Sequence, residues 1–109
     1  MSERTRLPDR RVTETFTLTH ADKAYTVSVG FFPPTLACPR EHPAEVFISG
    51  TKAGSDVEAV ARDGAVLLSI ALQYGVPLAV IQGAITRGRS DEPMTIIGAV
   101  VDLLTKEAR

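Results

Sequence analysis

The sequence predicts a single α+β domain in which a three-stranded antiparallel sheet comes first and three helices follow, packed on one face of the sheet. The first half of the chain alternates apolar and polar residues, as strands do, and the second half repeats apolar residues at helical spacing. The two kinds of pattern do not intermingle, which favours an α+β fold with the helices segregated from the sheet. A length of 109 residues is the usual size of one domain.

Strands are predicted at residues 12–19, 24–31 and 44–49. The second strand alternates most regularly, and residues 20–23 form the expected hairpin turn before it. Residues 32–43 contain four prolines, which cannot donate hydrogen bonds in a sheet, so this segment is predicted to be a loop. The three strands form a meander with one face open to water and one face covered by helices.

The first helix is predicted from signals at both of its ends. Ser55 and Glu58 have the spacing of a capping box, in which the serine hydroxyl accepts the backbone N–H of the glutamate. The helix runs to Tyr74, where Gly75 suits the left-handed residue that commonly ends a helix. Two shorter helices are predicted after it, at residues 78–86 and 93–106.

The first helix carries a large apolar surface. Its polar residues form only a narrow line: Glu58, Arg62, Ser69 and Gln73. A helix this apolar must be covered on most sides, either by the protein's own core or by another chain. In the second case we expect a homo-oligomer or a protein partner, with aromatic and arginine side chains central to the contact. The candidate interface residues are Arg62, Leu67, Ile70 and Tyr74.

Composition and charge exclude several classes of protein. The net charge of −1 gives no basic footprint for nucleic acid, and no apolar run reaches the roughly 20 residues that span a bilayer. The single cysteine cannot form an internal disulfide, which suits a reducing compartment. We therefore expect a cytoplasmic protein without a membrane segment or a nucleic-acid partner. Residues 1–11 are predicted to be a flexible tail, and residues 12–109 the folded domain.

Segments spread over nearly the whole chain carry a family resemblance. The most specific is the string Leu-Gln-Tyr-Gly-Val-Pro-Leu at residues 72–78. The others are residues 45–49, 52–55 and 68–71, the opening segments 7–11 and 14–16, and the ending at 97–104. Together they resemble the TSCPD domain, which is found near the C-terminus of vitamin B12-dependent ribonucleotide reductases, in its free-standing bacterial version.

The resemblance implies a non-catalytic accessory or interaction module, set in ribonucleotide reduction or DNA metabolism. Nucleotide reduction needs a thiyl radical and a cysteine pair, and this chain has one cysteine. The Thr-Ser-Cys-Pro-Asp string that names the domain is absent, since Cys38-Pro39 is followed by Arg40. We expect no cofactor. A subunit that completes the active site of a ribonucleoside-diphosphate reductase complex remains an alternative.

A different class of function is a small phosphate- or nucleotide-binding domain. The turn before the first helix contains Lys52, Gly54 and Ser55, and the free amides of a helix N-terminus attract anions. Arg87 and Arg89 flank a glycine and could also grip a phosphate. The turn lacks the Gly-Lys-Ser/Thr order of a Walker A loop. An ordinary capped turn and a solvated loop explain the same residues.

Cys38, Glu41 and His42 are close enough in sequence to be considered as a zinc site or as a Cys–His nucleophile. Structural zinc takes four ligands, so His20 would have to join them from elsewhere in the chain. The proline-rich surroundings suit a plain exposed loop instead. We therefore predict no metal site and no catalytic residue.

Overall fold

Three strands precede three helices, which confirms the predicted α+β class. The structure, a computed structural model, describes residues 3–50 and 55–107. The strands are β1 (Thr13–His20), β2 (Lys23–Phe32) and β3 (His42–Gly50). The helices are α1 (Asp56–Gln73), α2 (Leu78–Ala84) and α3 (Ile96–Glu107). Within the described residues, no helix combines the length and the hydropathy that a membrane crossing requires.

The third helix begins three residues later than its proline indicated. Thr95 is the residue that caps it, because its hydroxyl accepts the backbone N–H of Gly98 at 3.0 Å. Pro93 instead pairs with Arg87 across the preceding loop, in an isolated β-bridge. The loop between α2 and α3 therefore contains the residues that the sequence predicts at the end of the second helix and at the start of the third.

The sheet is antiparallel, in the order β1-β2-β3. The turn between β1 and β2 consists of Ala21 and Asp22, whose φ angles of 51° and 65° are both positive, as a tight hairpin turn of the primed type requires. In the register, Val29 of β2 lies beside Val46 of β3. Both side chains are buried on the face of the sheet that meets the helices, which is the inner face.

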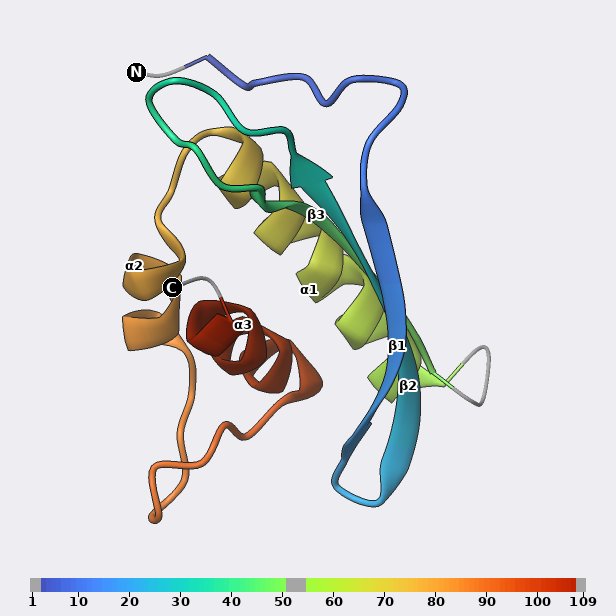
Figure 1. The fold of residues 1–109 in the computed structure, drawn as a ribbon. Helices are drawn as coiled ribbons and strands as arrows, with labels where there is room; N and C mark the ends of the chain where they lie inside the picture. The colour runs from blue at the N-terminus through green and yellow to red at the C-terminus, as the bar shows by residue number, and fades with distance from the viewer. Residues whose placement is uncertain (1–2, 51–54, 108–109) are drawn as a thin grey trace.

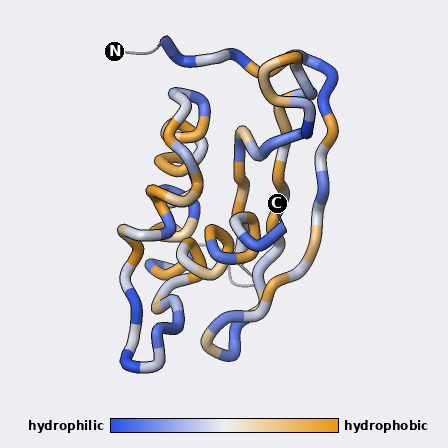
Figure 2. Tube along the Cα trace, turned by 60° about the vertical axis from the view of Figure 1, so that its left-hand side comes forward, coloured by the Kyte–Doolittle hydropathy of each residue, from blue (hydrophilic) through white to orange (hydrophobic). Residues whose placement is uncertain are grey.

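The core lies between the inner face of the sheet, α1 and α3. Figure 2 shows hydrophilic residues gathered in the loop between α2 and α3 and in the β1–β2 turn. The largest fully buried side chains are Val27, Val29, Val46, Val100 and Val101. Gly64 allows α3 to approach α1 closely, because a Cβ at this position would lie 2.6 Å from the side chain of Ile97.

Helix α1 runs alongside β3 and covers that edge of the sheet (Figure 1). The hydroxyl oxygen of Ser69 lies 2.8 Å from the backbone nitrogen of Val46 and 3.1 Å from its carbonyl oxygen. The amide nitrogen of Gln73 donates to the carbonyl oxygen of Ala44 at 3.0 Å. Ser69, Gln73 and Glu58 of the helix's polar line are therefore buried, the first two bonded to backbone groups of the edge strand, and only Arg62 of that line is exposed.

Both ends of α1 are capped as the sequence predicts. The hydroxyl of Ser55 accepts the backbone N–H of Glu58 at 3.1 Å. At the other end Gly75 has a φ of +86°, and its N–H donates to the carbonyl oxygen of Leu72. The N–H of Val76 reaches back to the helix's last turn in the same way, so the carbonyls there have partners.

The N-terminal segment contacts the rest of the domain at two places. The Arg4 Nε donates to the side-chain oxygen of Gln73 at 2.7 Å, and the Thr5 N–H donates to the Gln73 carbonyl at 2.8 Å. The Arg11 Nε lies 2.6 Å from the buried carboxylate of Glu45. That residues 1–11 form a flexible tail stays a prediction, and these contacts would oppose such motion.

Candidate functional site

Large apolar side chains are exposed to water along the side of α1 that faces away from the sheet. This side, the outer face of α1, consists of Val60, Val66, Leu67, Ile70 and Tyr74. Leu67 and Val60 are each 68% exposed, Tyr74 is 41% exposed, and Ile70 is half-buried. Three members of the outer face, together with the exposed Arg62, are the predicted interface residues. That they form an interface stays a prediction.

The exposure of these side chains follows from how α1 is packed. Ala61, Ala65, Leu68 and Leu72 point into the core, and Gly64 faces α3. Ser69 and Gln73 face β3. Since residues seven apart in a helix lie nearly in line, Val60, Leu67 and Tyr74 form a row on the remaining side. No described element packs over this row.

A groove of about 1170 Å³ opens at the end of the sheet where α1 ends. Its walls come from the N-terminal segment, from the loop between β2 and β3, and from the turn between α1 and α2. Much of the lining is apolar, including Leu7, Phe32, Pro43, Leu72, Val76 and Leu78. A groove of this size and lining can hold a small organic molecule. The sequence did not predict this groove, because its walls come from three segments that lie far apart in the sequence.

Cys38 and His42 lie together at the wall of this groove. The Cys38 sulfur is 3.5 Å from the His42 Nδ1, and the His42 ring lies against Phe32 with centroids 5.1 Å apart. Glu41 is exposed. His20, at the end of β1, lies beside the start of β2, whereas His42 lies beside the end of β2. Thus two of the four considered zinc ligands meet, too few for a structural zinc site. The described residues contain no group of three or more potential ligands.

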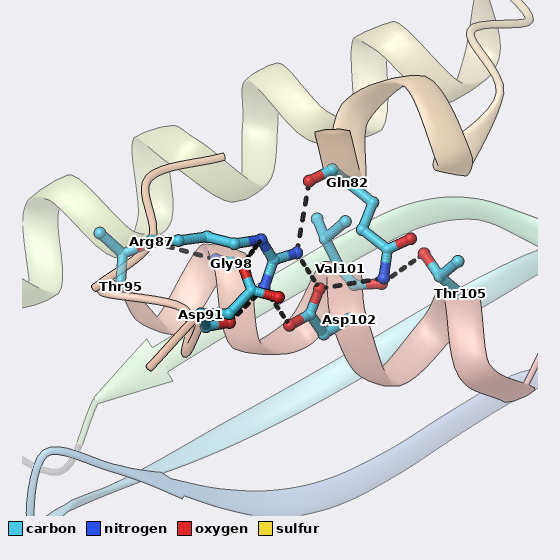
Figure 3. Close-up of polar contacts among 8 residues, drawn as sticks. All are labelled: Gln82, Arg87, Asp91, Thr95, Gly98, Val101, Asp102 and Thr105. Atoms are coloured by element: carbon cyan, nitrogen blue, oxygen red, sulfur yellow. Dashed lines mark hydrogen bonds and ion pairs between the residues drawn. The ribbon is translucent and has the colours of Figure 1, made fainter. Parts of the chain in front are cut away.

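The guanidinium of Arg87 is partly exposed and is held in place by hydrogen bonds to α2 and α3 (Figure 3). Its two terminal nitrogens donate to the two carboxylate oxygens of Asp102 at 3.0 and 2.7 Å. It also donates to the carbonyl oxygens of Asp91 and Gln82. The side-chain hydrogen bonds between Arg87 and Asp102, above all, raise the pKa of Arg87 and lower the pKa of Asp102. The pair ties the loop after α2 to α3.

The predicted phosphate site is only partly within the described residues, because Lys52 and Gly54 lie outside them. Ser55 caps α1, and the cavity of about 390 Å³ beside it is also lined by the buried acid Glu58, which disfavours an anion. Arg87 already binds Asp102, while Arg89 is exposed on the loop between α2 and α3. Phosphate binding by these residues stays a prediction.

The order of strands and helices, with α1 capped at both ends, defines a small α+β domain. Comparison with protein families matches residues 3–106 to the TSCPD domain. The chain belongs to the TSCPD domain family, which confirms the resemblance seen in the sequence. The match includes the N-terminal segment that contacts Gln73 and Glu45.

A similar protein is the vitamin B12-dependent ribonucleotide reductase of Rhodopirellula baltica. It is 33% identical to this chain over 110 residues, which cover 94% of this chain and 10% of the reductase. The chain therefore spans about a tenth of the length of this curated relative. No solved structure matches the chain.

Proposed function

We propose that this chain is a non-catalytic accessory module that binds a protein partner through the outer face of α1. The observation that supports it is the exposure of that face, where Leu67 and Val60 are each 68% exposed. Burying one large apolar side chain stabilises a complex by about 1.5–3 kcal/mol. A row of such side chains on one helix therefore offers a contact surface, with the charge of Arg62 at its rim.

The partner that fits is a chain resembling the remainder of a ribonucleotide reductase. In the relative, the matching region makes up 10% of one long chain and is covalently joined to the rest. A domain similar to this chain therefore occurs together with a reductase in that relative, which supports a chain of this type as the partner. The proposed setting is therefore DNA metabolism in the cytoplasm, where a single free thiol such as Cys38 stays reduced.

A catalytic role is less well supported than this accessory role. The one cysteine cannot supply the cysteine pair that nucleotide reduction needs. Cys38 and His42 lie within reach of each other, but no third side chain among the described residues joins them to orient the imidazole. The described side chains thus offer fewer groups for catalysis than for binding a protein partner.

Calorimetric titration of this chain against the vitamin B12-dependent type of reductase from the same organism tests the proposal. We expect Leu67→Glu to weaken binding roughly 100-fold, because hot-spot side chains contribute about 2–4 kcal/mol. Thr26→Glu is the matched control, since Thr26 is exposed on the open face of the sheet, away from α1. Equal affinity for Leu67→Glu and the wild type would exclude the outer face of α1, and no binding at all would exclude this partner.

A further inference from the structure

The outer edge of β1 has no partner among the described residues. β1 is an eight-residue strand at the end of the sheet, and it pairs with β2 alone (Figure 1). The carbonyl oxygen of Val12 accepts the Phe31 N–H, which shows that even-numbered residues of this strand direct their backbone groups toward β2. The backbone N–H and C=O groups of Thr13, Thr15, Thr17 and Thr19 therefore point away from the sheet.

This edge lacks most of the features by which proteins usually protect an exposed strand, and Glu14 is the one acidic side chain of β1. Proteins protect such edges with prolines, lysines, bulges or covering segments. β1 contains neither proline nor lysine, and the irregularity in the sheet lies in β2, at Gly30 and Phe31. The chain before β1 turns away from the edge, because Arg11 reaches over the sheet to Glu45 of β3. The edge is thus open to an added strand.

The residues of β1 make it complementary to a second copy of itself. When two β1 strands run antiparallel with Thr17 opposite Thr17, Phe16 lies opposite the second copy's Leu18 on the inner face. Glu14 then lies opposite the second copy's His20, which pairs an acid with an imidazole. On the open face, Thr15 lies opposite the second copy's Thr19. Apolar, charged and threonine pairs of these kinds stabilise antiparallel strands.

Other registers keep apolar pairs but lose the pair of Glu14 with His20. A shift of two residues in one direction sets Phe16 opposite Phe16 and Glu14 opposite Leu18, and in the other direction it sets Leu18 opposite Leu18 and Phe16 opposite His20. Shifts by one residue exchange the two faces of the strand. We propose that two copies of this chain pair through their β1 edges in the Thr17-centred register, which joins their sheets into one continuous antiparallel sheet. The inference does not rest on the proposed function, because β1 and α1 lie at opposite edges of the sheet.

Molar mass by light scattering over a dilution series tests the pairing. The full chain should approach twice 11.7 kDa with increasing concentration. Thr17→Lys should stay at 11.7 kDa, because it brings two ammonium groups together at the symmetry axis. Thr26→Lys is the matched control, since Thr26 lies directly beside Thr17 on β2 but away from the edge, and it should still dimerise. Circular dichroism is used to check that each variant is folded.

Cysteine cross-linking tests the register in a Cys38→Ser background. Facing residues 17 are about 5.5 Å apart between Cα atoms, so Thr17→Cys should form an intermolecular disulfide with a mild thiol oxidant. The two residues 13 would be about 27 Å apart, so Thr13→Cys should not. A single-chain mass at every concentration overturns the proposal. A dimer that persists in Thr17→Lys also overturns it. If the dimer is lost only in Leu67→Glu, self-association occurs through the outer face of α1 and the proposed β1 pairing is wrong.

Discussion

Gly75 and Gly83 differ in backbone conformation, although both have open space around them. A Cβ at either position would meet no atom within 4 Å. Gly75 has a φ of +86°, so Gly75→Ala should lower the free energy of unfolding by about 1–2 kcal/mol through backbone strain alone. Gly83 lies inside α2, so Gly83→Ala should raise it by about 0.5–1 kcal/mol. Urea denaturation measures both changes, and a shared sign would contradict this explanation.

Asp102 makes stability depend on pH at the acid end. Because the Arg87 hydrogen bonds lower its pKa in the folded state, the unfolded chain binds more protons as the pH falls below about 4. The stability that Asp102 contributes is present above that pH and is lost as the pH falls through the lowered pKa. We expect Asp102→Asn to lower the melting temperature at pH 7, and the difference from the wild type to shrink below pH 4. A difference that is constant with pH would show that the charge is unimportant.

Single residues were predicted well where their role is local. Ser55 and Gly75 cap α1 as expected, because a capping partner lies within four residues in the sequence. Phosphate binding by Arg87 stays a prediction, and in the structure this loop residue bonds to Asp102 of α3. The sequence could not show that the fold brings these two groups together.

The contact between α1 and β3 depends on a few polar side chains. Ser69 is buried, and its hydroxyl contacts both backbone groups of Val46. Ser69→Ala leaves those groups without a partner away from water, which should cost about 1–3 kcal/mol. Ser28→Ala is the control, because its hydroxyl bonds only to Thr15 on the open face and should cost less than about 0.5 kcal/mol. Urea denaturation compares the two, and equal costs would mean that Ser69 is not needed at the edge.

At the scale of elements, alternation and helical spacing were enough to predict every strand and helix in order. The phase of α1 was harder to predict. Its polar line would ordinarily mark the solvent side of a helix, but Glu58, Ser69 and Gln73 are buried. An edge strand offers unpaired backbone groups, and these favour polar neighbours over apolar ones. The apolar side chains of α1 that the core does not bury therefore lie on its outer face.

At the scale of the whole molecule, the groove depends on segments that the sequence treats separately. That residues 1–11 form a flexible tail stays a prediction. In the structure Leu7 and Pro8 line the groove, and Thr5 bonds to the end of α1. The apolar pair Leu7 and Pro8 within this polar segment was the one sequence signal that could have indicated a contact with the rest of the domain. Periodicity cannot place such a segment, because it has no regular structure of its own to predict.

The covering of β3 by α1 also limits how far the chain can assemble. A sheet with two open edges can add copies without end, as amyloid-forming strands do. In this chain α1 covers β3, and Ser69 and Gln73 bond to the backbone groups of Val46 and Ala44, so each copy has one open edge, that of β1. Pairing through β1 consumes both offered edges, and the combined sheet ends at a covered β3 on either side. With the proposed pairing through β1, growth would therefore stop at two chains, because the helix that covers β3 leaves no second edge for a fibre.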